Sequence, residues 1–170
     1  FKAFQQLQFK NNKCFRTMAI KDTSGFHQNT VSDLKIIDIP QVKDYRGNLS
    51  VVEGEVIPFE IQRVYYLYDV PSDSHRGGHA HKVLHQFLIP LSGSFDVVVQ
   101  DGLGGTKTFP LNKPSKGLLI VPGIWRELNN FSSGAVCLVL ASEKFDEADY
   151  IREFKNFTQF KKSSSSHEIF

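Results

Sequence analysis

Several kinds of feature are scarce in this chain of 170 residues, and each scarcity argues against a class of protein. The two cysteines, Cys14 and Cys137, lie far apart in sequence. Because Cys137 also sits in an apolar run, it predicts a reduced, buried thiol rather than a disulfide. No apolar run approaches the roughly 18–20 residues that span a bilayer, and the first residues lack the apolar core of a signal peptide. The net charge of only +2 gives no reason to expect nucleic-acid binding. We therefore expect a cytoplasmic protein with neither a membrane nor a nucleic acid as partner.

Helical periodicity is also scarce, since only Lys144–Phe157 shows it. The rest of the chain alternates between short β-branched or aromatic runs and turn clusters rich in Gly, Pro, Asn, Asp and Ser, as in an all-β domain. An apolar content of 41% suffices for one buried core. The predicted strands are Leu34–Ile39, Leu49–Val52, Ile61–Tyr68, Leu84–Leu91, Ser94–Gln100, Lys107–Leu111, Gly117–Val121 and Ala135–Ala141. Strands at this spacing predict a sandwich, jelly roll or barrel.

The two ends of the chain differ in composition from the middle. Residues 1–32 are polar with scattered Phe, and we expect an N-terminal extension outside the domain. The only methionine is Met18, which leaves open whether residues 1–17 are native. Residues 158–170 are polar and serine-rich, and they predict a C-terminal tail that frays. The folded domain is therefore predicted to span residues 33–157.

The segment Arg76-Gly-Gly-His-Ala-His-Lys82 carries the clearest functional signal. On a strand, His79 and His81 point to the same face, because side chains alternate across the pleat. Their spacing to Gln86 and Gly93 matches the first motif of the cupins, jelly rolls that commonly bind a metal ion. In that motif an acidic ligand stands where this chain has Gln86.

The second cupin motif also lacks its metal ligand. After the turn at Pro122-Gly, Trp125 and Arg126 stand in the region where a third histidine is expected. With two of the four usual ligands replaced, we expect no metal ion. His85 remains an alternative third imidazole for zinc.

Charged residues near the histidine pair favour an anionic ligand. Arg63, Tyr65 and Leu67 share one face of the predicted strand Ile61–Tyr68. An arginine facing a barrel interior needs an anion to neutralise it, whereas on a solvated face it is an ordinary surface charge, and the sequence leaves both open. Arg76 and Lys82 bracket the histidines, which makes a negative ligand at the mouth more plausible.

These motifs together resemble one family. The segments Asp44-Tyr-Arg-Gly-Asn48, Arg63–Val70, His75–Lys82, Pro122–Trp125 and Phe145–Arg152 resemble the WxcM-like cupins, sugar-nucleotide 3,4-ketoisomerases that act on dTDP-4-keto-6-deoxyglucose. The resemblance covers roughly residues 33–157. It implies a metal-free cupin jelly roll without any cofactor, and a homodimer that exchanges N-terminal strands.

The resemblance also implies the roles of particular residues. His79, His81 and Tyr65 would be catalytic, and Arg46, Arg63 and Arg76 would bind the nucleotide diphosphate, with Arg46 reaching the partner subunit's site. We add Lys82 and Trp125 to the substrate-binding residues. Trp125 is expected at the pocket mouth, with its ring packed on the sugar or the thymine base.

Histidine suits the implied reaction because its unperturbed pKa lies near neutrality. Moving a ketone from C-4 to C-3 requires removal of the C-3 proton, an enediol intermediate and reprotonation at C-4. We assign the carbon proton to His79 and the oxygen side to His81 with Tyr65, although the sequence does not distinguish the two histidines.

The product would supply an aminotransferase that makes a 3-amino-3,6-dideoxy sugar for a surface glycan such as lipopolysaccharide or an S-layer glycan. The sequence leaves its C-4 configuration, gluco or galacto, open. The alternatives are a 3,5-epimerase of the same fold, a non-catalytic sugar-nucleotide-binding module and a metal-dependent cupin oxygenase.

Overall fold

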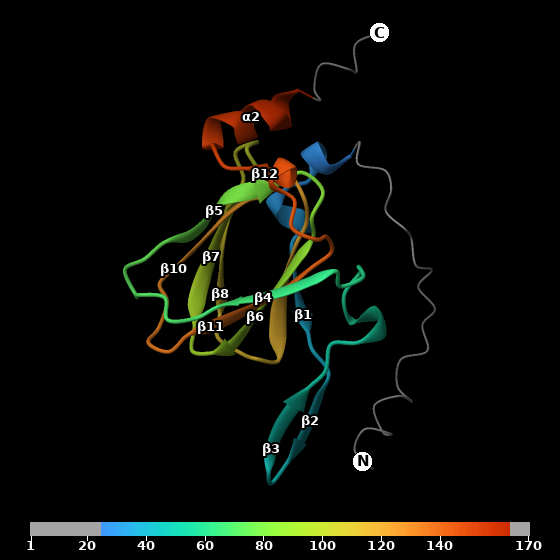
Figure 1. Cartoon of the computed structure of the whole chain (residues 1–170), viewed down its shortest axis with the longest axis vertical. Coiled ribbons are helices and arrows are strands. Elements are labelled where there is room, and N and C mark those ends of the chain that lie inside the picture. The colour runs from blue at the N-terminus through green and yellow to red at the C-terminus, as the bar shows by residue number, and fades with distance from the viewer. Residues whose placement is uncertain (1–24, 164–170) are drawn as a thin grey trace.

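The chain folds into two facing antiparallel sheets, as its turn-punctuated sequence predicts. The computed structural model describes residues 25–163 and contains two five-stranded sheets (Figure 1). The first sheet holds, in spatial order, β1 (Lys35–Asp38), β9 (Lys116–Ile120), β6 (Gln86–Ser92), β11 (Val136–Ala141) and β4 (Arg63–Leu67). The second holds β12 (Tyr150–Ile151), β5 (Arg76–His81), β10 (Trp125–Asn129), β7 (Phe95–Gln100) and β8 (Thr106–Leu111). This mostly-β arrangement is consistent with a cupin jelly roll.

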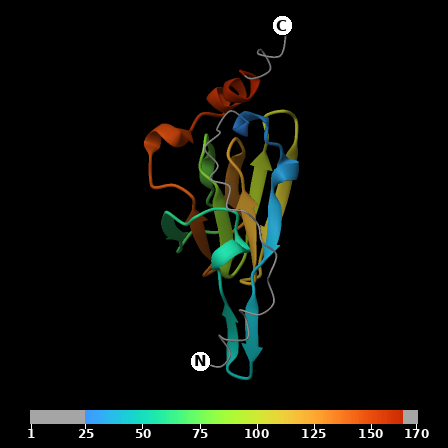
Figure 2. The same ribbon diagram turned by 90° about the vertical axis from the view of Figure 1, so that its right-hand side faces the viewer.

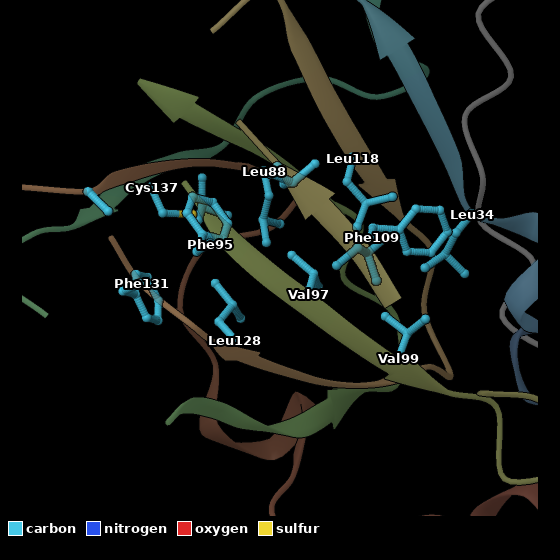
Figure 3. Close-up of a cluster of buried hydrophobic side chains, with 14 of the residues drawn as sticks. Leu34, Leu88, Phe95, Val97, Val99, Phe109, Leu118, Leu128, Phe131 and Cys137 are labelled. Atoms are coloured by element: carbon cyan, nitrogen blue, oxygen red, sulfur yellow. The ribbon is translucent and has the colours of Figure 1, made fainter. Parts of the chain in front are cut away.

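The main core lies between the two sheets and follows the alternation of the strands. In β7, Phe95, Val97 and Val99 are buried, and the residues between them are only half-buried. These side chains join Leu88 of the opposite sheet in one apolar cluster (Figure 3). Cys137 belongs to the same cluster as a fully buried free thiol, which confirms the prediction for this cysteine. Burial raises the pKa of its thiol to about 12, so it is an inert core residue.

All eight predicted strands match observed ones, with ends that differ by no more than two residues. The predicted strand Leu49–Val52 corresponds to β3 (Gly47–Ser50), which forms a hairpin with β2 (Gln41–Asp44), a strand that was not predicted. The closing glycine of the first cupin motif, Gly93, follows β6 with a φ of +63°. A Cβ there would collide with Ser132 and the Ala135 backbone, so the turn requires glycine.

The C-terminal part differs from the prediction in both position and extent. Tyr150 and Ile151 pair with β5, and helix α2 covers Phe154–Lys162 instead of residues 144–157. Lys161 is buried, and its ammonium donates to the carbonyl oxygens of Asn29 and Gly123. The folded domain thus continues past residue 157. No helix within residues 25–163 is long and apolar enough to cross a membrane.

The domain also begins earlier than predicted. Two 3₁₀ turns, Phe26–Gln28 and Val31–Asp33, precede β1. The Asn29 side chain donates to the carbonyl of Pro122 at 2.9 Å, and the Val31 amide donates to Asp101 at 3.3 Å. Residues 26–32 therefore pack on the domain, while residues 1–24 of the predicted extension and residues 164–170 of the predicted tail lie outside the described residues.

The β2–β3 hairpin projects from the end of the molecule opposite to α2 (Figures 1 and 2). All four residues of β3 are exposed, and Tyr45 in the turn is 97% exposed. Nothing in the rest of the described chain packs around this arm closely enough to bury its tip. The exchange of N-terminal strands between two subunits stays a prediction.

Candidate functional site

A cavity of about 380 Å³ opens between the two sheets. One side of it comes from β4, β6 and β11, and the other from β5, β10 and the segment around β12. The polar lining consists of Arg63, Tyr65, Arg76, His79, Arg126 and Tyr150, and the apolar lining of Leu67, Leu88, Leu128, Val139 and Phe145. Three of these polar residues carry a permanent positive charge, so the cavity suits an anionic ligand that also has an apolar part.

Strand alternation brings most of the predicted residues of β4 and β5 into this cavity; His81 does not line it, but its ring lies against the lining residues His79 and Tyr150. On β4, Arg63, Tyr65 and Leu67 are half-buried and line the cavity, whereas Val64 and Tyr66 face outward. The structure thus answers the question that the sequence left open, because Arg63 faces inward. On β5, His79 and His81 lie edge to face with ring centroids 4.9 Å apart, as predicted for an i and i+2 pair.

His81 is held by a carboxylate that was not among the predicted site residues. Its Nδ1 lies 2.8 Å from Asp149 Oδ2, and both side chains are buried. A carboxylate only accepts hydrogen bonds, so Nδ1 carries the proton. Burial lowers the pKa of His81, and the hydrogen bond to Asp149 offsets part of this effect. The Nε2 atom of His81 is buried and has no hydrogen-bond partner among the described residues.

His79 is held from a different side, by Arg126 of β10. The two residues are opposite each other in the β5–β10 pairing, and Arg126 Nη2 lies 3.1 Å from His79 Nε2. A guanidinium only donates, so the Nε2 lone pair of His79 is already engaged. Burial lowers the pKa of His79 to about 2, and the Arg126 charge acts in the same direction. His79 is therefore a neutral imidazole at physiological pH.

Gln86, at the position of the cupin acid, links Tyr65 to Arg126. Its Nε2 donates to the Tyr65 hydroxyl at 2.7 Å, and its Oε1 accepts from Arg126 Nε at 2.8 Å. Because the hydroxyl oxygen already accepts this bond, the Tyr65 proton is free to be donated elsewhere. Burial raises the pKa of Tyr65, so the phenol stays protonated.

Arg63 brings a buried positive charge to the cavity wall. Its Nε and Nη2 atoms are buried and have no partner among the described residues. Its guanidinium lies over the rings of Tyr65 and Phe145, at 5.2 and 5.7 Å from their centroids. A buried cation with unused donors is costly unless an anion pairs with it, so this side of the cavity is suited to a phosphate.

Three predicted substrate-binding residues do not line the cavity. Arg46 lies at the tip of the projecting hairpin, where it pairs with Asp44 at 2.6 Å and keeps 69% of its side chain exposed. Lys82 points away and donates to the carbonyl of Ala148 at 2.7 Å. Trp125 is 5% exposed and packs against Phe154 and Phe157 of α2. Its position differs from the expected pocket mouth because its neighbour Arg126 takes the inward face of β10.

The alternative third imidazole, His85, lies elsewhere. Its ring contacts Phe26 and Phe59, with centroids 5.7 and 6.1 Å apart. Residues 25–163 contain no group of three or more His, Cys, Asp and Glu side chains placed to hold a metal ion. Each histidine of the cupin motif has one ring nitrogen within hydrogen-bond distance of a protein side chain, Asp149 for His81 and Arg126 for His79.

Comparison with known proteins identifies the family. Residues 32–162 match the profile described as "FdtA: WxcM-like, C-terminal". This chain belongs to the WxcM-like family. It is 42% identical over 127 residues to a TDP-4-oxo-6-deoxy-α-D-glucose 3,4-oxoisomerase from Aneurinibacillus thermoaerophilus. The aligned region covers 74% of this chain and 91% of that protein.

Solved structures of WxcM-like relatives superpose well on this chain. A 3,4-ketoisomerase from Helicobacter canadensis is 45% identical, with a TM-score of 0.74 over 76% of this chain and 98% of that one. QdtA, a sugar 3,4-ketoisomerase from Thermoanaerobacterium thermosaccharolyticum solved with TDP, is 42% identical. Its TM-score is 0.76 over 78% of this chain and 97% of that one. A variant of the same enzyme has been solved with TDP-4-keto-6-deoxyglucose.

Five residues of this WxcM-like site were not predicted as part of it: Gly77, Gln86, Arg126, Asp149 and Tyr150. Tyr150 packs on both histidines, with ring centroids 4.9 and 4.3 Å away, because β12 pairs with β5. Gly77 has a φ of +77°, its carbonyl accepts from Arg126 at 3.3 Å, and a Cβ there would overlap the Arg126 guanidinium. Asp149 and Tyr150 lie within Phe145–Arg152, a segment that carries the family resemblance, and this membership was the sequence signal that could have identified them.

Proposed function

We propose that this chain is a TDP-4-keto-6-deoxyglucose 3,4-ketoisomerase. The observation that carries the proposal is the 42% identity to the oxoisomerase, over 91% of that protein's length. The geometry of the cavity supports it, because the imidazole of His79, the phenol of Tyr65 and the unpaired donors of Arg63 line it, and the ring of His81 lies directly against His79. Isomerisation moves one proton between carbons and one between oxygens, and no electrons leave the sugar, so this scheme needs no cofactor.

We assign the carbon proton to His81, which reverses the assignment made from the sequence. A carbon base needs a free lone pair, and His81 Nε2 is buried and unpartnered among the described residues. In His79 the corresponding lone pair accepts a hydrogen bond from Arg126. His81 thus removes the C-3 proton, which the C-4 carbonyl acidifies, and returns it to C-4 of the enediol.

Tyr65 and His79 serve the oxygen side in this scheme. Tyr65 donates its proton to O-4 as the enediol forms, because Gln86 already occupies the phenol oxygen as a donor. The proton on O-3 then leaves as the C-3 ketone forms and returns to the Tyr65 phenolate, which restores the hydroxyl, while His79 accepts a hydrogen bond from Arg126 and so holds that guanidinium beside the oxygens. The Arg126 guanidinium, fixed by Gln86 and Gly77, stabilises the negative charge of the enediolate.

The arginines of the cavity bind the nucleotide diphosphate. Arg63 and Arg76 line the cavity, and the unused donors of Arg63 suit a phosphate oxygen. Arg46 acts in the partner's site of a homodimer that exchanges the β2–β3 arm. The product feeds an aminotransferase that makes a 3-amino-3,6-dideoxy sugar, and we propose that this takes place in the cytoplasm.

A coupled assay tests the proposal directly. The purified protein is incubated with TDP-4-keto-6-deoxyglucose, a sugar 3-aminotransferase and its amino donor, and the amino sugar is identified by NMR. We expect a 3-amino-3,6-dideoxyhexose, whose formation is lost in Tyr65→Phe and His81→Asn. Unchanged 4-keto sugar with the wild-type protein, despite measurable binding, would overturn the proposed activity.

A further inference from the structure

The carboxylate of Asp149 binds the backbone with one oxygen and the His81 ring with the other. It directly precedes β12, which pairs with β5 so that Tyr150 lies opposite His81. One carboxylate oxygen, Oδ1, accepts from the backbone amides of Lys82 at 3.0 Å and Val83 at 2.8 Å. The other, Oδ2, is aimed at His81 Nδ1 at 2.8 Å. The carboxylate therefore has one fixed orientation, with a separate partner for each oxygen.

The charge of this carboxylate is stabilised in spite of its burial. Burial alone raises the pKa of Asp149, but the hydrogen bonds from His81 and the two backbone amides outweigh it, and the pKa lies below its usual value. Asp149 is thus an ionised acceptor. It contacts His81 through Nδ1 only, on the side of the ring away from the unpartnered Nε2.

We propose that Asp149 is a positioning residue that holds His81 as the Nδ1–H tautomer, so that the Nε2 lone pair faces the substrate. Neutral imidazole has one protonated and one unprotonated nitrogen, and the nitrogen that a carboxylate binds is the protonated one. The buried, unpartnered acceptor at Nε2 is then explained as the atom that receives the sugar proton. This inference rests on the proposed ketoisomerase activity, with His81 as the carbon base.

The substitution Asp149→Asn is the sharpest test, because it keeps the shape of the side chain. The two backbone amides hold the Asn oxygen, so its NH₂ group must face His81 Nδ1 and donate to it. His81 then becomes the Nε2–H tautomer, which has no lone pair toward the substrate. We expect kcat to fall by about 10²- to 10⁴-fold, with KM and the Kd for TDP changed less than about twofold.

The tautomer is measured separately by long-range ¹H–¹⁵N NMR of the histidine rings, with His81 assigned from its loss in His81→Gln. We expect the Nδ1–H form in the wild-type protein and the Nε2–H form in Asp149→Asn. The matched control is Asp146→Asn, which changes an exposed carboxylate that only caps the Glu147–Asp149 turn. This control should keep wild-type kcat and the wild-type His81 tautomer.

Each outcome decides the proposal. An Nε2–H tautomer in the wild-type protein overturns it, and this result does not depend on whether Asp149→Asn folds. Wild-type kcat in a folded Asp149→Asn variant also overturns it. If the wild-type protein shows the Nδ1–H tautomer but does not isomerise the sugar, the proposed activity fails while the role of Asp149 in fixing the ring stands.

Discussion

Gln86 stands where the cupin motif has an acid, and an amide can donate a hydrogen bond as well as accept one. A carboxylate at position 86 could only accept, whereas the Gln86 amide donates to Tyr65 and accepts from Arg126 at the same time. This single residue therefore keeps the phenol proton available and holds the guanidinium beside His79. The same position that binds a metal ion in many cupins becomes a connector between an acid and a cation.

Gln86→Glu should impair catalysis without unfolding the protein. The carboxylate would pair with Arg126 and accept the Tyr65 proton, which turns that proton away from the substrate. We expect kcat to fall by about 10- to 100-fold in steady-state assays. Gln62→Glu makes the same change at an exposed position and should leave kcat unaltered. An unimpaired Gln86→Glu enzyme would mean that the direction of this hydrogen bond is irrelevant.

The buried histidines determine the pH dependence of the rate. Burial lowers the pKa of both His79 and His81, and a base is active above its own pKa. As pH falls, kcat/KM should therefore stay level through 6.5, the ordinary value for His, and decline only at more acidic pH. Because the pKa of Tyr65 is raised, kcat/KM should also stay level up to about pH 9. An acidic limb centred at or above pH 6.5 would contradict this assignment.

At the scale of elements, the sequence predicts the strands that carry strong alternation and misses those that do not. The alternation of side chains in β4 and β5 can be read from residue types, so the sequence predicts which residues share a face; the structure adds that Tyr65 and His79 line the cavity. In β10, charged and apolar residues are mixed, and nothing local indicates which of Trp125 and Arg126 faces inward. The pairing of Arg126 with His79 decides it.

The position of Asp149 could not be derived from local sequence either. Strand β12 has only two residues, and it exists because it pairs with the edge of β5. Helix α2 starts later than its periodicity suggests for the same reason, since the residues before it are used in that pairing. Such placements depend on tertiary contacts, which outweigh short-range propensity.

The contact between α2 and β10 offers a test at this scale. Phe157 is fully buried against Trp125, while Phe154 contacts the same indole but is 40% exposed. Phe157→Ala should lower the free energy of unfolding by about 3–5 kcal/mol and shift Trp125 emission to the red. Phe154→Ala should cost less in a denaturant titration. Equal effects of the two variants would show that α2 is not anchored through Phe157.

At the scale of the whole molecule, the β2–β3 arm is the part that the fold itself does not explain. It projects from the body (Figure 2), and the pairing of Asp44 with Gly47 places Arg46 in the turn at its tip. An exposed arm with an arginine at its turn fits a dimer in which each subunit completes the other's site.

Mixing two inactive variants tests this arrangement. In a heterodimer of Arg46→Ala and His81→Asn subunits, one site receives both wild-type residues and the other receives neither. Random subunit exchange in an equal mixture should therefore restore about a quarter of wild-type activity. A mixture that stays inactive, although mass spectrometry shows heterodimers, would argue that each site is built from one chain.

The central claim is that the carbonyl moves between C-4 and C-3 while C-5 is untouched, and NMR of the sugar in D₂O tests it most directly. TDP-4-keto-6-deoxyglucose is incubated with the wild-type protein in D₂O, with His81→Asn as the inactive control. We expect the TDP-3-keto-6-deoxyhexose to appear with protium retained at C-5. Deuterium at C-5 would instead indicate a 3,5-epimerase, and an unchanged sugar that nevertheless binds would indicate a non-catalytic module. Either result would contradict the account.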